Sequence, residues 1–279
     1  MSLSSLLGVP PGPVDLSSYD TNGHPGFDGD KDAGKKALAG MAAPLSDLQE
    51  RLFADGKAAG TRSILLVLQG MDTSGKGGIL RHAVGLFDPQ GVHIKAFKAP
   101  TDEETQHDFL WRIAREVPDA GMIGIFDRSH YEDVLIAKVR GFADDDEIER
   151  RYGAINDFEA RLVDSGTTVI KCMLHVSSDT QEERLLERLD NPAKHWKYNP
   201  GDVDERALWP KYQRAYETAL ERCNTEAAPW HVVPADRKWY RNWAIASLLH
   251  EGLEAFELGW PTADFDVETE RARLLALEL

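Results

Sequence analysis

A chain of 279 residues suits one large domain or two small ones, and it is long enough to bury a sizeable core. Hydrophobic residues make up 42% and charged residues 28% of the sequence, which is typical of an ordinary soluble globular protein. The formal net charge of −15 argues against a general nucleic-acid binder, but it leaves room for a local basic groove that holds a polyanion.

The sequence predicts a cytoplasmic protein without a membrane partner. Cys172 and Cys223 are its only cysteines, and two such thiols are typical of unpaired residues in a reducing compartment. No stretch approaches the roughly 20 apolar residues that a membrane span needs. The start of the chain also lacks the basic region and the long apolar core of a secretory signal.

Residues 1–42 are predicted to form an extended N-terminal arm. They are rich in Gly, Pro, Asp and Ser, and the segment "TNGHPGFDGD" offers several turns without apolar periodicity. We expect this arm to be ordered only if it lies on the body of the protein or on a neighbouring subunit. Apolar residues then recur at helical spacing, which predicts a helix from near Pro44 to Gly56.

Short apolar runs alternate with longer helical patterns through the rest of a domain that spans residues 43–260. Strands are predicted at 63–69, 92–98, 122–127, 167–174 and 230–235. Helices are predicted near 76–87, 103–116, 130–139, 145–165, 179–190, 204–224 and 238–257. This alternation indicates an α/β fold of three layers, with a parallel sheet of about five strands and helices on both faces. The tail, residues 261–279, is predicted to be a short amphipathic helix or a frayed end.

The segment "GMDTSGKGG", residues 70–78, follows the first strand and has the spacing G-x-x-x-x-G-K of a phosphate-binding loop. A glycine-rich turn before a helix directs backbone N–H groups into one concavity, at the positive end of the helix dipole. We therefore expect phosphate to contact the loop glycines and the Lys76 ammonium. The loop glycines are Gly70, Gly75, Gly77 and Gly78. A chance match in a turn is the alternative, and the placement between a strand and a helix argues against it.

Gly77 departs from the usual pattern, in which a Ser or Thr hydroxyl after the lysine holds the magnesium of a nucleoside triphosphate. A metal must then find its protein ligands elsewhere, and Asp72 inside the loop is the obvious substitute. A carboxylate that faces phosphates is repelled unless a divalent cation or a transferable proton lies between them. Asp72 is predicted either to bind magnesium or to accept a proton from an attacking phosphate and orient it. The alternative role is a cap on the following turn.

The segment "MIGIFDRSHYEDVL" places Asp127 at the carboxyl end of a buried strand, where a Walker-B carboxylate binds metal. The planar guanidinium of Arg128 suits a phosphate chain, although the two residues could instead form a structural ion pair. Glu132 and Asp133 lie in the first turn that follows. There they either complement the helix dipole or bind metal.

Residues 184–214 combine cations with aromatic side chains in an otherwise acidic protein. The cations are Arg184, Arg188, Lys194, Lys197, Arg206, Lys211 and Arg214. This pattern predicts a movable lid that closes over phosphate, with Lys194 and Lys197 near its tip. Acidic residues lie among the bases, so a solvated surface is the alternative.

Together these motifs resemble the polyphosphate kinase 2 family over nearly the whole chain, from about Leu16 to Trp260. The resemblance rests on the combination of "LQGMDTSGKGG", "FKAPTDEE", "FLWRI", "IFDRSHYEDVL", "HVSSDTQEERLLERLDNPAKHWKYNPGD" and "APWHVVPADRKWYRN". It implies a P-loop kinase fold with a helical lid. It also implies magnesium-dependent phosphoryl transfer between inorganic polyphosphate and nucleotides, with manganese as a substitute metal.

The resemblance also implies roles for individual residues. Asp72 and Lys76 would serve in the phosphate loop, and Asp127 would bind metal. Arg128 would grip the phosphates together with four bases of the lid. These bases are Arg184, Arg188, Lys194 and Lys197. Relatives often carry an acidic residue in place of Gly77, so a side-chain contact at that position is not expected here.

The expected reaction is a reversible in-line transfer of the terminal phosphoryl group of polyphosphate to ADP, GDP or AMP. The inventory of charges suits it, because phosphoryl transfer needs positioning and charge neutralisation rather than a protein nucleophile. An ATP-dependent kinase of a small metabolite or of a nucleotide is the alternative enzyme. A GTPase-like switch lacks its N-K-x-D or T-K-x-D motif, and a degenerate binding module would not retain all four site residues. The preferred acceptor is left open, and a homodimer or homotetramer is expected.

Overall fold

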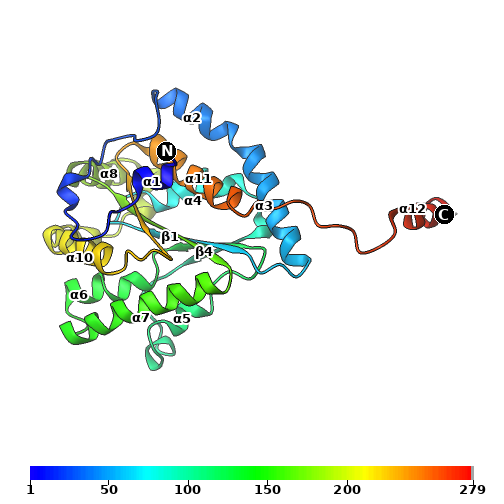
Figure 1. Ribbon diagram of the computed structural model, residues 1–279. Helices are drawn as coiled ribbons and strands as arrows, with labels where there is room; N and C mark the ends of the chain where they lie inside the picture. Colours follow the sequence, from blue (N-terminus) through cyan, green and yellow to red (C-terminus); the bar gives the residue numbers. More distant parts are fainter. Residues whose placement is uncertain (278–279) are drawn as a thin grey trace.

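The protein, described by a computed structural model over residues 1–277, is built on one five-stranded parallel sheet (Figure 1). The strands lie in the order β2-β3-β1-β4-β5. In chain order β1 to β5 span Ser63–Gln69, Val92–Ala96, Ile123–Asp127, Thr167–His175 and Trp230–Pro234. All five predicted strands are confirmed, because each is a short apolar run with β-branched residues.

β1 lies at the centre of the sheet and is buried along its whole length. Helices α6 and α7 cover one face of the sheet, and α4 and α11 cover the other (Figure 1). Burial on both faces explains why β1, β3, β4 and β5 are largely apolar, whereas the edge strand β2 is partly exposed and carries His93 and Lys95. Since all strands run parallel, their carboxyl ends meet at one edge, where the loops that follow them gather.

The predicted helices are present, although four of them are interrupted, and the one predicted at 76–87 is α-helical only to His82 before a 3-10 turn at Val84–Leu86. From α3 to α11 the helices span Ala42–Lys57, Lys76–His82, Trp111–Ala114, Ile136–Arg140, Asp145–Asp164, Ser178–Asp190, Gly201–Arg206, Trp209–Arg222 and Lys238–Glu254. The segments predicted at 103–116 and 130–139 each begin with a 3-10 turn and only then become α-helical. The segment at 204–224 divides into α9 and α10, and Pro210 lies in the first turn of α10.

The N-terminal arm is ordered against the body, which is one of the two placements expected for it, but it is not wholly extended. It contains α1 at Leu3–Leu7 and α2 at Lys31–Gly40. The side chains of Ser2 and Asp30 cap these helices. Both helices were missed because α1 is very short and α2 carries few apolar residues. Glu251 of α11 holds the start of α1 by accepting from the N–H groups of Leu3 and Ser4 (2.6 and 3.0 Å).

The C-terminal segment forms α12 at Val267–Leu275, which is the first of the two alternatives expected there, a short helix or a frayed end. An exposed stretch of chain carries α12 clear of the body (Figure 1), and none of its residues is buried. Over residues 1–277, no helix combines the length and the apolar character that crossing a membrane requires.

Candidate active site

The predicted phosphate loop connects β1 to α4 at the carboxyl edge of the sheet. Its backbone takes left-handed conformations at Gly70 (φ +150°), Thr73 (φ +64°) and Gly75 (φ +113°). Gly75 has a second reason to be glycine, because a Cβ there would lie 1.8 Å from Nη1 of Arg241. A Cβ on Gly77 would meet no atom within 4 Å, so packing leaves room for a side chain there.

Lys76 spans the loop from within. Its Nζ donates to the carbonyl oxygen of Gly70 at 2.7 Å, so the ammonium lies across the mouth of the turn. Burial lowers the pKa of Lys76, and the nearby carboxylates of Asp72 and Asp127 act in the opposite direction. A lysine held in this way is a preformed partner for an oxyanion.

Asp72 and Arg128 form an ion pair, with 2.8 Å between Oδ1 and Nη2. The structure thus joins two predicted site residues that lie in different loops. Arg128 has a left-handed backbone (φ +64°), which is uncommon for a residue with a side chain and turns the guanidinium back toward the phosphate loop. Although burial opposes it, Glu132 and Asp72 raise the pKa of Arg128.

Glu132 lies close to Arg128, Lys76 and Asp72 and belongs to their cluster of charges. From the sequence alone, it could be given only a helix-dipole or a metal-binding role. The Gln69 amide donates to Oε1 of Glu132 at 2.9 Å while its oxygen accepts from Ser129. Burial raises the pKa of Glu132, and Arg128 and Lys76 oppose that effect. Gln69 ends β1 and was missed, although a glutamine at the end of an apolar strand is a recognisable feature.

Asp127 ends β3, as predicted, with its backbone paired to Leu68 of β1 and Ala96 of β2. Within residues 1–277 its carboxylate makes no hydrogen bond or ion pair, so its oxygens are available. In the same part of the chain, His, Cys, Asp and Glu form no group of three or more that could hold a metal. Two carboxylates, those of Asp72 and Asp127, are nevertheless the hard oxygen donors that suit Mg²⁺ when phosphate and water complete the shell.

The four predicted lid bases lie in α8 and in the 3-10 segment Pro192–Lys197. Arg188 donates to the Lys197 carbonyl (3.0 Å) and to Oδ2 of Asp202 (3.1 Å), Lys194 pairs with Glu187, and Lys197 lies 4.9 Å from the Trp196 ring centre. Their contact with phosphate stays a prediction.

Arg184 has a different setting from the one predicted. It is 8% exposed, and its guanidinium donates to four backbone carbonyl oxygens. These belong to Thr73, Ser74, Ala235 and Asp236. Arg184 therefore lies behind the phosphate loop and supports it, instead of projecting from the lid into the space above.

Two cavities meet beside the Asp72–Arg128 pair. The smaller one, about 240 Å³, lies between the phosphate loop and the lid helices α9 and α10. Asp202 and Tyr216 line its lid side. The larger one, about 660 Å³, lies between α6 and the segment that precedes α5. Arg128 and Glu132 line both cavities, so one cluster of charges serves two binding spaces.

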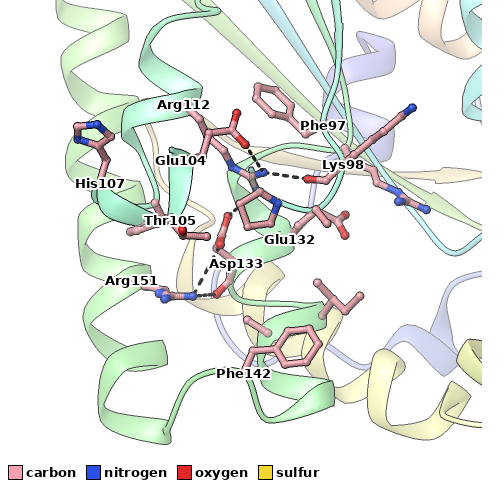
Figure 2. Close-up of a pocket in the computed structure, with 16 residues that line it drawn as sticks. Phe97, Lys98, Glu104, Thr105, His107, Arg112, Glu132, Asp133, Phe142 and Arg151 are labelled. Carbon is pink, nitrogen blue, oxygen red and sulfur yellow. Dashed lines mark hydrogen bonds and ion pairs between the residues drawn. The ribbon is translucent and has the colours of Figure 1, made fainter. Parts of the chain in front are cut away.

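Aromatic and charged side chains together line the larger cavity (Figure 2). Phe97, Phe109 and Phe142 contribute aromatic rings, and Phe142 is 73% exposed. Arg112 and Arg151 contribute positive charges to its wall. A hollow of this size with several rings and a few fixed charges suits a flat heterocycle that carries an anionic group.

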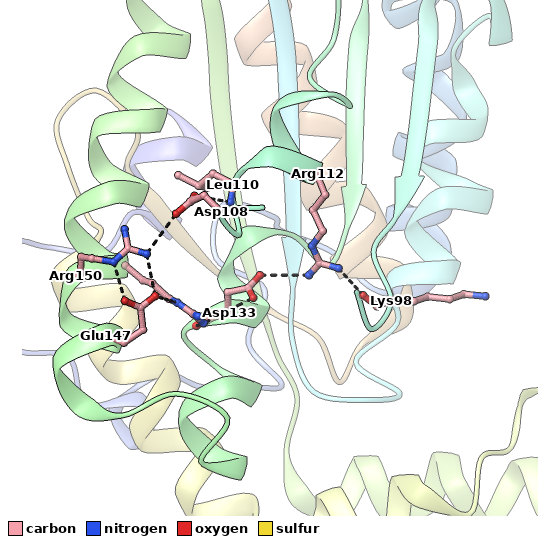
Figure 3. Close-up of polar contacts among 8 residues, drawn as sticks. Lys98, Asp108, Leu110, Arg112, Asp133, Glu147 and Arg150 are labelled. Carbon is pink, nitrogen blue, oxygen red and sulfur yellow. Dashed lines mark hydrogen bonds and ion pairs between the residues drawn. The ribbon is translucent and has the colours of Figure 1, made fainter. Parts of the chain in front are cut away.

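Ion pairs hold the charged residues of this cavity wall in place (Figure 3). Arg112 donates to the Lys98 carbonyl oxygen at 2.8 Å and to Oδ2 of Asp133 at 3.3 Å. Arg151 donates to the Asp133 carbonyl oxygen at 2.8 Å and also pairs with Glu147. Burial raises the pKa of Asp133, while both arginines oppose the rise. The network joins segments after β2 and β3 to α7, so the cavity wall is held in one arrangement.

Residues 28–258 match the model of a family described as "Polyphosphate kinase 2 (PPK2)". The chain is 43% identical over 252 residues to an AMP/ADP-polyphosphate phosphotransferase of Meiothermus ruber, covering 90% of this chain and 93% of that protein. It is 36% identical over 260 residues to an ADP-polyphosphate phosphotransferase of Rhodopseudomonas palustris, covering 89% and 88%. The crystal structure of polyphosphate kinase 2 from Arthrobacter aurescens TC1 superposes with a TM-score of 0.96 at 55% identity, over 99% of this chain and 97% of that one.

Proposed function

Because the chain belongs to the polyphosphate kinase 2 family, with its P-loop kinase-like fold, we propose that it transfers the terminal phosphoryl group of inorganic polyphosphate to a nucleotide. One observation carries this function. The phosphate loop and the Asp72–Arg128 ion pair lie where two cavities meet, so a donor and an acceptor can both reach the same charges. The relatives' names, which join polyphosphate to AMP or ADP, supply the substrates.

We assign the acceptor nucleotide to the larger cavity and the phosphates to the loop and the smaller cavity. The three phenylalanine rings give a nucleobase an apolar surface, and Arg112 and Arg128 lie within reach of its phosphates. Polyphosphate would lie against the loop N–H groups and Lys76. Arg128, which lines both cavities, would contact both chains where they meet.

The residues act by position and charge. Loop N–H groups, Lys76 and Arg128 hold the transferred group in line between donor and acceptor and neutralise its charge. Asp72 orients the attacking phosphate oxygen of the nucleotide, and no protein nucleophile is needed. Asp72 and Asp127 would hold Mg²⁺, or Mn²⁺ in its place, and the bound ion would screen the repulsion among phosphates. The same arrangement serves the reverse reaction.

The proposal includes both AMP and ADP as acceptors, since the relative at 43% identity is named for both. It also includes a cytoplasmic location and a homo-oligomer, a dimer or a tetramer. The location is supported by Cys172 and Cys223, which are buried and unpaired as in proteins of reducing compartments.

The test is nucleotide product formation from AMP and from ADP, measured separately, with magnesium and polyphosphate as the only phosphoryl donor. We expect ADP from AMP and ATP from ADP. Replacing polyphosphate with ATP provides the control. Product that appears only with ATP would overturn the proposal in favour of an ATP-dependent kinase.

A further inference from the structure

Three successive carbonyl groups of the phosphate loop point outward to buried side chains. The Asp72 oxygen accepts from Nε2 of Gln181 at 3.0 Å. The Thr73 oxygen accepts from Nη1 of Arg184 at 2.9 Å, and the Ser74 oxygen accepts from Nη1 of Arg241 at 2.9 Å. The donors come from α8 and α11, which lie far apart in the sequence.

These bonds determine where the loop's N–H groups point. In a trans peptide the carbonyl and the following N–H point in opposite directions, and the chain has no cis peptide over residues 1–277. The N–H groups of Thr73 and Gly75 therefore face away from Gln181 and Arg241, into the concavity. The N–H between them, that of Ser74, donates to the Met71 carbonyl at 3.0 Å and closes the turn. Side chains behind the loop thus aim its phosphate donors.

Arg241 touches the loop so closely that two glycines are required. A Cβ at Gly75 would lie 1.8 Å from Nη1 of Arg241, and a Cβ at Gly78 would lie 2.6 Å from its Nη2. The arginine is 3% exposed. Its Nε and Nη2 donate to Oδ1 of Asn242 at 3.3 and 3.1 Å, so its nearest side-chain partner is a neutral amide.

The positive charge of Arg241 lacks a negative partner within residues 1–277. Neither Arg184 nor Arg241 forms an ion pair with a carboxylate of residues 1–277, although each is at most 8% exposed. Burial, and then the proximity of Arg184, lower the pKa of Arg241 to about 9. Burial lowers the pKa of Arg184 as well, but the nearby carboxylates of Asp236, Glu187 and Glu183 oppose that effect. A buried charge without a counter-ion is costly, which a purely structural role does not explain.

We propose that Arg184 and Arg241 are positioning residues for phosphoryl transfer, which orient the loop's N–H donors, and that Arg241 also supplies positive charge that the bound phosphate chain balances. The inference rests on the proposed function in naming polyphosphate as that chain. In this proposal Arg184 supports the phosphate loop from behind and does not contact the phosphates from the lid.

Two substitutions separate orientation from charge. Arg241→Gln removes both the charge and the long donor to Ser74. Asn242→Asp keeps Arg241 and its hydrogen bonds but places a carboxylate beside the guanidinium. The matched control is Arg62→Gln, which removes an arginine that bonds the Phe256 carbonyl near the opposite end of β1. The probe is inorganic triphosphate, with its dissociation constant measured by calorimetry and the melting temperature measured with and without it.

We expect Arg241→Gln to weaken triphosphate binding at least tenfold and Asn242→Asp at least fivefold, while Arg62→Gln binds as the unsubstituted protein does. Asn242→Asp should not lower the melting temperature without triphosphate, because it supplies the missing counter-ion. It should, however, reduce the rise in melting temperature that triphosphate causes.

Triphosphate binding by Asn242→Asp within twofold of the unsubstituted protein would overturn the charge-balancing role, even if Arg241→Gln failed to fold. Unchanged binding by a folded Arg241→Gln would overturn both roles. Binding of triphosphate needs no turnover, so this result is independent of the donor assay. Absence of polyphosphate-dependent product would overturn the proposed function, whereas the triphosphate measurements would still decide the roles of the two arginines behind the loop.

Discussion

Asp72 belongs to the phosphate loop and is also one of the charged residues of the proposed reaction. Its backbone carbonyl is held by Gln181, and its carboxylate pairs with Arg128, so the side chain has a fixed position at the mouth of the loop. In the proposed reaction the carboxylate orients the attacking oxygen and contributes to the metal site, whereas the loop amides bind the phosphates. Binding and turnover should therefore depend on this residue to different degrees.

We predict that Asp72→Asn abolishes turnover while triphosphate binding remains measurable. The amide keeps the size of the side chain but removes the charge that Arg128 and a metal require. Turnover by the polyphosphate assay and binding by calorimetry separate the two effects. Turnover equal to that of the unsubstituted protein would remove Asp72 from the mechanism.

At the scale of elements, α9 and α10 form one side of the smaller cavity. Lys194 and Lys197 precede them on the exposed 3-10 segment Pro192–Lys197 and do not line the aromatic cavity assigned to the nucleotide. Charge reversal of both, Lys194→Glu with Lys197→Glu, is predicted to weaken polyphosphate binding more than nucleotide binding. Dissociation constants for triphosphate and for ADP give the comparison. Equal losses would show that the lid does not grip the donor.

The arm is attached to the body through two buried histidines. Nε2 of His175 bonds the Leu16 carbonyl at 3.1 Å, and Nε2 of His231 lies 3.0 Å from the Ser4 hydroxyl. Burial lowers the pKa of both histidines, against opposing contributions from Asp236 at His175 and from Glu251 at His231. The unfolded chain therefore binds protons more readily than the folded one as the pH falls below the ordinary histidine value of about 6.5.

It follows that acidification from pH 7 to pH 5 should destabilise the protein, by about 1.4 kcal/mol for each unit by which a histidine pKa is lowered. The double variant His175→Gln with His231→Gln cannot titrate at these positions and should lose less stability over the same range. Urea unfolding at both pH values measures the difference. An equal loss in the variant would assign the acid sensitivity to other groups.

The sheet and the phosphate loop could be predicted from the sequence, because both depend on local patterns of residues. Apolar runs with β-branched residues located the strands, and the G-x-x-x-x-G-K spacing located the turn. The support behind the loop could not be predicted, since Gln181 and Arg241 reach it from distant parts of the chain. The sequence held one sign of this support, because Arg241 and Asn242 interrupt an otherwise largely apolar helix pattern in "KWYRNWAIASLL". The contacts of Arg184 behind the loop could not be predicted for the same reason, since a lid sequence does not show which way an arginine points, and its contact with phosphate stays a prediction.

At the scale of the whole molecule, the two ends of the described chain differ in how much they contribute to the stability of the fold. α1 buries Leu3 and Leu7 against the body, whereas α12 buries none of its residues. Deleting residues 1–8 is predicted to lower the free energy of unfolding by about 3 kcal/mol, since two leucines lose their burial. Deleting residues 261–279 should change it by less than about 0.5 kcal/mol. Denaturant unfolding of both truncations tests the contrast, and a large loss from the second would contradict it.

The order of the strands also determines when the site can form during synthesis. β1, which leads into the phosphate loop, is made first but pairs only with β3 and β4. As the chain leaves the ribosome, this strand has no neighbour until residue 127 has emerged, and it lacks the second until residue 175 has followed. Arg241 arrives later still. A nascent chain halted before β4 would hold the glycine-rich motif as an unsupported turn, so we expect the ability to bind phosphate to be acquired only after Arg241 has emerged.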